Sequence, residues 1–465
     1  MTVPVQMSSS LRPRLAIGVL TALCLSAFLA SIPLPRADGE LLGGDGFGYY
    51  VYLPSVVLDH DLDFSNQAAA LTAHGGIPLR RLTPNGRPAN VWPAGPAFLW
   101  LPFFLLAHGL AFVLNLMGAG IRMDGCGYWH QAFVIAGNIA YGGIGLVFAF
   151  DAARRVVASA AALWATLLLT CAGNLVYYLT GEPSMSHPVS LFAVAAFYAY
   201  WMSTRGQSGA GRAVKLGALI GLIALVRTQE VLLVVAPLLE DLAAAWRRRE
   251  SAGHAAVGGW TRDMVVLAVG ALVAYSPQFV ISHVLFGTWW KPPQLHAGWG
   301  SLPLFTWSSP HLLDALVSVH RGLLVWHPIY AAALLGVVPL WRKDRGLAAA
   351  VLGGVLGQAY VVGGWYDWGQ GHAFGGRAFI GCVPLLTLSL GALLEAAWRR
   401  ASVAPRLVPA LTSALAAVLI VANLLLLVEY RLVLATTSRE ITWRDLGIGR
   451  VEILVGRLGR PAGGR

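Results

Sequence analysis

The chain has 465 residues, of which 57 % are hydrophobic and 12 % are charged, whereas about 25 % of the residues of a soluble domain are charged. A soluble protein of this length needs more charge on its surface, so the composition excludes soluble, disordered and disulfide-scaffold classes and predicts an all-α polytopic membrane protein. The four cysteines lie far apart without a C-x-x-C pair, which argues against a disulfide framework and a thiolate zinc site. They are Cys24, Cys126, Cys171 and Cys382.

The net charge of +11 comes largely from short basic segments that lie between apolar runs. These segments contain Arg12/Arg14, Arg154/Arg155, Arg205/Arg212/Lys215, Arg247–Arg249 with Arg262, Arg342/Lys343/Arg345, and Arg399/Arg400/Arg406. Basic loops between spans are typical of the cytoplasmic side, so the pattern predicts a multi-pass protein of the inner (plasma) membrane in contact with membrane lipids. Nucleic-acid binding, the other interpretation of a basic chain, is not expected.

The first apolar run, Leu15–Leu34, follows a basic N-terminus. Ala27 and Ala30 resemble a signal-peptide cleavage site, but the run exceeds the usual apolar region of a signal peptide, about 7–15 residues. We therefore expect residues 1–14 to be cytoplasmic, residues 15–34 to form the first span, and residues 35–130 to form a large periplasmic loop.

Within this loop, Ala97–Leu116 is apolar enough to span but carries Pro102 and His108 and follows Pro96. Counting it as a crossing would place most of the basic clusters outside, so a re-entrant or juxtamembrane helix is predicted. Residues 131–430 then form a multi-span domain, and residues 431–465 a basic tail on the outer side, although its arginines argue against that side.

Ten further spans are predicted, for a total of about eleven. They are Ala132–Phe150, Val157–Tyr178, Pro188–Met202, Leu216–Val226, Val231–Ala245, Met264–Phe286, Gly322–Leu340, Leu347–Gly364, Ala378–Ala397 and Leu407–Val428. Two of them are shorter than a full crossing and would form a broken pair that meets near Arg227, Gln229 and Glu230. Gly217 and Gly221 predict close helix packing.

Under this topology, the polar residues gather on the outer side. The patches are Gly43–Tyr50 with Leu53–Ser55 and Asp59–Asp63; Gly181–His187; Trp289–His327 with Lys291, His296, Trp299, His320 and Arg321; and Trp365–Arg377. Charge at membrane depth is expensive, so carboxylates and arginines at span ends suggest a shared cavity suited to a lipid-linked phosphate.

Most candidates also have a structural interpretation. Asp45 could cap a helix near Gly48, and the three aspartates of residues 59–63 fit a solvated turn or a divalent-cation site. Glu182 and His187 could form a structural polar cluster. Arg377 could snorkel at a span end, His320 and Arg321 could anchor a span, and the tryptophans could form an interfacial belt. Residues 43–48 lack the Lys-Ser/Thr of a P-loop.

Several short motifs together resemble the GT-C superfamily, the polyprenyl-phosphate-sugar-dependent membrane glycosyltransferases that include protein O-mannosyltransferases and aminoarabinose transferases. The motifs are Asp45–Tyr50 (Asp-Gly-x-Gly-Tyr-Tyr), Pro93-Ala94-Gly95-Pro96, Glu182–His187, Arg227-Thr228-Gln229 and Phe374-Gly375-Gly376-Arg377. The resemblance implies that Asp45 is catalytic. Its neighbour is Gly46 where the family often has a second acidic residue, and Trp92–Pro96 lacks the cation of the corresponding O-mannosyltransferase segment.

The resemblance implies inverting transfer of a sugar from a polyprenyl-phosphate donor to a hydroxyl of a lipid, glycan or protein at the outer face of the membrane. Asp45 would be the general base, and Arg377, with Lys291 or Arg321, would meet the leaving phosphate. Glu182 or His187 would orient the sugar. The other predicted substrate-binding residues are Tyr49, Tyr50, Arg227, Gln229, His320, Asp367 and His372. Dependence on a divalent cation stays open, because no ligand set has convincing spacing.

A second hypothesis is a transporter or flippase of a lipid-linked sugar, which explains the broken spans but predicts polar groups facing both sides. A non-catalytic scaffold of an envelope-assembly complex is a third class. Consumption of a donor by the purified protein distinguishes the enzyme from both.

Overall fold

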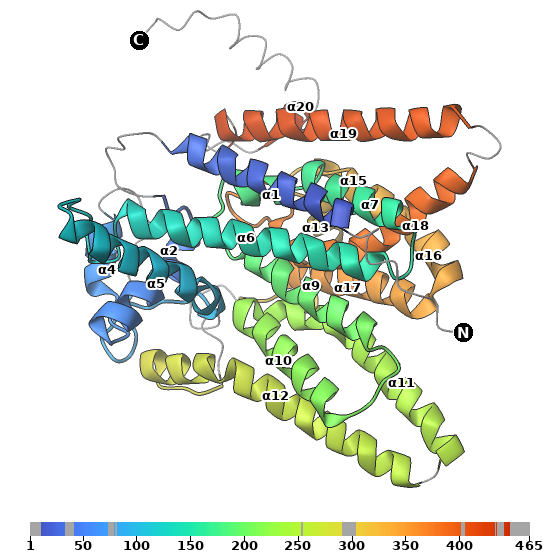
Figure 1. Ribbon diagram of the computed structural model, residues 1–465, viewed down its shortest axis with the longest axis horizontal. Helices are drawn as coiled ribbons and strands as arrows, with labels where there is room; N and C mark the ends of the chain where they lie inside the picture. Colours follow the sequence, from blue (N-terminus) through green and yellow to red (C-terminus); the bar gives the residue numbers. More distant parts are fainter. Residues whose placement is uncertain are drawn as a thin grey trace, which may run out of the picture. The chain divides into compact units, whose positions relative to one another are not determined.

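The computed structural model describes residues 11–32, 41–72, 79, 81–252, 254–290, 304–400, 405–432, 434 and 441–446. Among these residues the regular elements are all helical, with two isolated β-bridges and no strand (Figure 1). Seven helices are long and apolar enough, by length and composition, to cross a membrane. The all-α polytopic membrane class predicted from composition is therefore confirmed.

Every predicted span coincides with a helix or a broken helix. The continuous ones are α1 (Leu11–Ser31), α6 (Tyr128–Ala153), α9 (His187–Ser203), α10 (Ala210–Val226), α11 (Val235–Ala252), α12 (His254–Phe286), α17 (Arg345–Gly364), α18 (Val383–Arg399) and α19 (Leu407–Leu432). Val157–Tyr178 is interrupted, with α7 (Ser159–Cys171) followed by α8 (Leu175–Thr180). Gly322–Leu340 is divided into α14 (Leu323–Trp326), α15 (Ile329–Leu335) and α16 (Val337–Lys343).

The two breaks remove two predicted spans from the seven long apolar helices; α9 and α10 have only 17 residues each, and the 18 residues of α11 carry several charges. The helix α5 (Gly95–Leu116), predicted as re-entrant or juxtamembrane, has 22 residues and is one of the seven. It begins with a proline in its first turn and continues through Pro102, so proline does not end it. Its length permits a crossing, and the side of each later loop stays a prediction.

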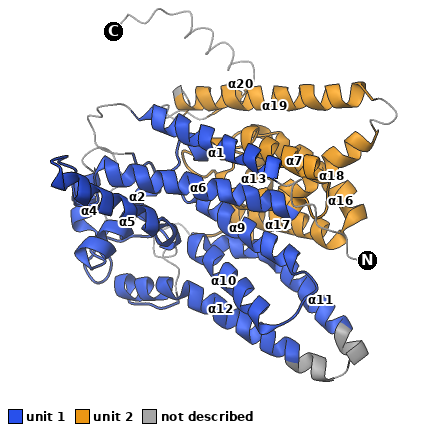
Figure 2. Cartoon of the chain, in the orientation of Figure 1, with its two compact units in different colours: residues 1–152, 178–304 blue, residues 153–177, 305–465 orange. Residues whose placement is uncertain are grey.

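The chain forms two compact units, residues 1–152 with 178–304 and residues 153–177 with 305–465 (Figure 2). In unit 1 the predicted first outer loop contains the short helices α2 (Gly46–Tyr50), α3 (Tyr52–Pro54) and α4 (Ser65–Thr72) and the π-helix η2 (Ser55–Asp59). Phe47, Tyr50, Trp100 and Phe104 are almost fully buried there. Burial of these aromatic rings makes α2, α3 and α5 one packed layer.

The three aspartates at and after the end of η2 accept hydrogen bonds from residues close to them in the sequence. Asp59 accepts from the side-chain amides of Asn66 and Gln67, and Asp61 accepts from the Ser55 hydroxyl at 2.9 Å. Asp63 accepts from the hydroxyl and the backbone N–H of Ser65 at 2.6 and 3.0 Å, and these hydrogen bonds lower its pKa. This geometry supports the solvated-turn interpretation, because each carboxylate is engaged in a local bond.

Helices α10 and α12 of unit 1 lie side by side (Figure 1). A Cβ on Gly217 would lie 2.1 Å from the carbonyl oxygen of Leu267, and one on Gly221 would lie 2.4 Å from that of Ala271. The two glycines therefore allow the backbones to approach, as their spacing predicted.

In unit 2, α7, α15 and α16 pack against α18, whose residues from Val383 to Ala392 are buried. A Cβ on Gly336 would lie 1.9 Å from the carbonyl oxygen of Ser389, so this glycine permits the contact. At the end of α18, Glu395 accepts from Lys343 at 2.9 Å and from the backbone N–H of Ala158 at 2.9 Å. These bonds connect α18 to the end of α16 and to the loop before α7.

Candidate functional site

Asp45 lies at the end of a glycine turn in unit 1. The N–H of Gly46 donates to the carbonyl of Gly43 at 2.8 Å, and Gly44 has a φ of +49°, a left-handed value that favours glycine. Asp45 occupies the N-cap position of α2, but its side chain makes no cap hydrogen bond. The geometry thus gives no support to the interpretation of Asp45 as a helix cap.

The turn Gly181–His187 packs closely against this glycine turn. Ser184 Oγ accepts from the backbone N–H of Gly43 at 3.0 Å. A Cβ on Gly44 would lie 2.9 Å from Glu182 Oε1, and one on Gly46 would lie 2.4 Å from Ser184 Oγ. The close approach explains why the segment is glycine-rich, and it brings together two segments that are far apart in the sequence.

A buried amide of α6 supports the Gly181–His187 turn. Asn138 Nδ2 donates to the carbonyls of Pro183 and Met185 at 2.7 and 2.8 Å, and Asn138 is fully buried. Sequence reasoning missed this residue. Its signal was an amide in the middle of an otherwise apolar run, which must find partners when it is buried.

Arg227 lies at the break between α10 and the 3-10 helix η3 (Thr228–Val234), with an extended backbone at φ −152°. Its guanidinium contacts Glu230 Oε1 at 3.2 Å, Ser186 Oγ at 3.3 Å and His187 Nδ1 at 3.5 Å. The helical break expected near Arg227, Gln229 and Glu230 is present, and it directs the arginine to the Gly181–His187 turn.

The adjacent tyrosines of α2 have different surroundings. Ser186 Oγ donates to the Tyr49 hydroxyl at 3.1 Å, so Tyr49 belongs to the same cluster as Arg227. The hydroxyl of Tyr50 donates to the carbonyl of Gly125 at 2.5 Å, and Tyr50 is fully buried beside Phe104. Successive helical residues point in directions about 100° apart, which separates the two rings.

Unit 2 contains a second cluster, in the loop between α17 and the 3-10 helix η5 (Arg377–Cys382). Arg321, at φ 68°, donates from Nε to the carbonyl of Ala373 at 2.9 Å. Tyr430 donates to the carbonyl of His372 at 2.9 Å, and Asp367 accepts from the N–H of Gly371 at 3.0 Å. The hydrogen bonds that hold this loop therefore end largely on its backbone atoms.

Three buried polar residues support the same loop: His327, which lies in a patch predicted from the sequence, and Asn174 and Asn423, which sequence reasoning missed. Asn174 Nδ2 donates to the carbonyl of Gly376 at 2.9 Å, and His327 Nδ1 lies 2.9 Å from Asn423 Oδ1. A Cβ on Gly375, whose φ is +64°, would lie 2.2 Å from His327 Nε2. These contacts hold the Gly375-Gly376 pair, and Arg377, the first residue of η5, directly follows that pair in the sequence.

The remaining predicted residues either pack against this loop or lie outside the described residues. The ring of His320 meets the edge of Trp368 at 6.4 Å between centroids. Lys291 and His296 lie outside the described residues. Within the described part of the chain, no group of three or more His, Cys, Asp or Glu side chains could hold a metal ion.

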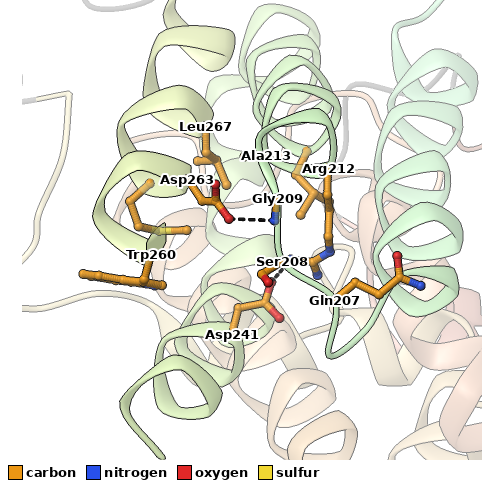
Figure 3. A pocket seen from close by; sticks show the side chains of 11 residues that line it. Gln207, Ser208, Gly209, Arg212, Ala213, Asp241, Trp260, Asp263 and Leu267 are labelled. Atoms are coloured by element: carbon orange, nitrogen blue, oxygen red, sulfur yellow. Dashed lines mark hydrogen bonds and ion pairs between the residues drawn. The ribbon is translucent and has the colours of Figure 1, made fainter. Parts of the chain in front are cut away.

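A small pocket of about 30 Å³ lies among α10, α11 and α12 of unit 1 (Figure 3). Asp263 accepts from the N–H of Gly209 at 2.7 Å, and Arg212 pairs with Asp241 at 2.8 Å. The cavity has room for water and not for a lipid-linked sugar. Its ion pair and the Asp263 bond at the start of α10 indicate a structural role.

No family model matches the chain, and no curated protein matches it. Among solved structures, the crystal structure of ArnT from Cupriavidus metallidurans bound to undecaprenyl phosphate is similar, with a TM-score of 0.49 and 15 % sequence identity. The similarity covers 94 % of this chain and 75 % of that chain.

Proposed function

We propose that this protein is a membrane glycosyltransferase that transfers a sugar from a polyprenyl-phosphate donor to an acceptor hydroxyl at the outer face of the inner membrane. The observation that carries the proposal is the junction of two turns in unit 1, where Ser184 binds Gly43 and Glu182 lies against Gly44. This junction brings the segments of the two acidic residues Asp45 and Glu182 together in a largely apolar, helical chain.

In this proposal Asp45 accepts the proton of the attacking acceptor hydroxyl, and attack at the anomeric carbon inverts its configuration. The bond that breaks joins the anomeric carbon to the donor phosphate, which leaves as polyprenyl phosphate. Glu182 and His187, on the turn that holds the Asp45 segment, orient the sugar. A carboxylate is a weak base, so positioning of the reactants supplies most of the rate.

The departing phosphate requires a cation to balance its developing charge. The sequence predicts Arg377 for this role, and Arg377 follows the Gly375-Gly376 pair that His327 and Asn174 hold in unit 2. The guanidinium of Arg321 donates to backbone carbonyls of the same loop, at 2.9 Å from Ala373 and 3.5 Å from Gly369. Arg321 is therefore assigned to shaping this loop, and the role at the phosphate stays a prediction for Arg377.

Turnover by the purified protein tests the proposal. The protein in nanodiscs is supplied with radiolabelled polyprenyl-phosphate sugars and a membrane lipid extract, and release of polyprenyl phosphate is measured. Release that depends on both the donor and the extract supports the transferase. In sealed vesicles, movement of the donor between leaflets without its consumption would replace this proposal with the transporter or flippase.

A further inference from the structure

The break between α10 and η3 contains a buried ion pair whose role the proposed chemistry does not specify. Glu230 is only 1 % exposed, and its carboxylate accepts from the Ser190 hydroxyl at 2.8 and 2.6 Å. Arg227 Nε lies 3.2 Å from Glu230 Oε1, and the arginine side chain is 15 % exposed. A buried carboxylate needs such partners, because its desolvation is otherwise very costly.

The guanidinium of Arg227 is engaged on most of its donor sides. Nε faces Glu230, and Nη1 faces Ser186 and His187 at 3.3 and 3.5 Å. With its amide oxygen turned toward the guanidinium, Gln229 accepts from Nη2 at 2.9 Å. These contacts use four of the five N–H donors of the guanidinium, so a phosphate that binds through two donors would have to displace a protein partner.

These contacts continue to the segment that carries Asp45. Ser186 Oγ, which Arg227 contacts, donates to the Tyr49 hydroxyl at 3.1 Å. The backbone N–H of Tyr49 donates to the carbonyl of Asp45 at 3.3 Å, so Tyr49 is one helical turn beyond that residue. The sequence of contacts therefore runs from Glu230 through Arg227, Ser186 and Tyr49 to the backbone of Asp45.

We infer that Arg227 and Glu230 form a positioning pair, which fixes the orientation of α2 and thereby of Asp45, and that neither residue binds the donor phosphate. The inference rests on the proposed function, because positioning matters only if Asp45 acts on the acceptor. It assigns Arg227 and Gln229, which the sequence predicted to bind substrate, to the support of the site.

The test replaces both charges by unbranched apolar side chains, in the double variant Arg227→Met/Glu230→Met. Removing one partner would leave a buried charge unpaired, whereas replacing a buried pair by apolar residues of similar volume often preserves folding. The matched control is Arg212→Met/Asp241→Met, which removes another largely buried ion pair of unit 1, with side-chain exposures of 12 % and 13 %. This control pair joins α10 to α11 and lines the small pocket of Figure 3.

For the Arg227/Glu230 double variant, we expect kcat to fall by about 100-fold, because small misplacements of a catalytic group have effects of this size. Binding of polyprenyl phosphate should stay near the wild-type value, and so should the melting temperature. Hydrogen exchange at the amides of residues 46–50 should become faster in this variant and not in the control.

Loss of polyprenyl-phosphate binding with retained kcat would overturn the inference and make Arg227 a phosphate ligand. Wild-type kcat together with unchanged exchange at residues 46–50 would also overturn it. If the wild-type protein consumes no donor, the proposed function fails instead. Faster exchange in the double variant would then still support the positioning pair, so the two failures are distinguishable.

Discussion

Ser184 Oγ accepts a hydrogen bond from the backbone N–H of Gly43 at 3.0 Å, across 141 residues of sequence. This bond joins the turn before Asp45 to the turn that carries Glu182 and His187. The proposed chemistry depends on this junction, because it gives the acidic segment a fixed place in unit 1. Variants on either side of the junction should therefore affect activity before they affect global stability.

Gly44→Ala should weaken activity more than Gly43→Ala. The new Cβ of Gly44→Ala would lie 2.9 Å from Glu182 Oε1 on a backbone at φ +49°, which costs about 1–2 kcal/mol in an L-residue. Gly43→Ala places its Cβ 3.3 Å from the same oxygen, without a left-handed φ. Turnover measured for both variants at equal protein concentration checks the order, and equal losses would contradict it.

Ser184→Ala should lower kcat with a small effect on the melting temperature. The variant removes the acceptor of the Gly43 N–H, a bond worth about 1 kcal/mol. Ser203→Ala is the control, because its exposed hydroxyl donates to the local carbonyl of Tyr200. If Ser184→Ala behaves like Ser203→Ala in steady-state kinetics, the junction does not position Asp45.

Asn138→Leu should destabilise the protein by about 2–3 kcal/mol, because two buried carbonyls lose their donor. Asn138→Asp should be worse, since a carboxylate would face the carbonyls of Pro183 and Met185. Thermal unfolding in detergent measures both effects. A melting temperature of Asn138→Asp at or above that of Asn138→Leu would show that these hydrogen bonds do not hold the turn.

Gly217→Ala should destabilise unit 1, whereas Gly211→Ala should be neutral or slightly stabilising. The first Cβ would lie 2.1 Å from a backbone oxygen of α12, and the second would meet nothing within 4 Å. Alanine in an open helical position gains about 1 kcal/mol over glycine. Equal melting temperatures for the two variants would mean that α10 and α12 can separate without cost.

In unit 2, Arg377→Lys should raise the KM for the donor, and Arg321→Lys should mainly lower the melting temperature. A lysine keeps the charge but loses the planar fork that, in Arg321, donates to the carbonyls of Ala373 and Gly369. Donor titrations and unfolding curves of the two variants separate these roles. A raised donor KM for Arg321→Lys alone would reverse the assignment.

The sequence was sufficient to predict the helices, because an apolar run long enough to span is a strong local signal. It also predicted the break near Arg227, where charged and amide residues interrupt such a run. The breaks within Val157–Tyr178 and Gly322–Leu340 were not predicted. Pro328 and Gly336 were visible in the second run, but proline and glycine do not always end a membrane helix, as Pro102 in α5 shows.

The arrangement of the site was harder to predict from the sequence. Asp45 and the Glu182–His187 turn were identified as candidates, but nothing local indicates that Ser184 binds Gly43 or that Asn138 holds the turn. Adjacent Tyr49 and Tyr50 share one motif, yet the hydroxyl of Tyr49 meets Ser186 and that of Tyr50 meets Gly125. Such pairings arise from long-range packing, which no spacing rule specifies.

The most direct measurement compares sugar transfer and polyprenyl-phosphate binding in the wild-type protein, Asp45→Asn and the control Asp63→Asn. Asp63 lies in the same predicted loop, where it accepts local hydrogen bonds from Ser65. Loss of a general base predicts that Asp45→Asn turns over at least about 100-fold more slowly while binding polyprenyl phosphate normally, with Asp63→Asn close to wild type. Wild-type transfer by a folded Asp45→Asn protein would contradict the assignment of Asp45 as the base.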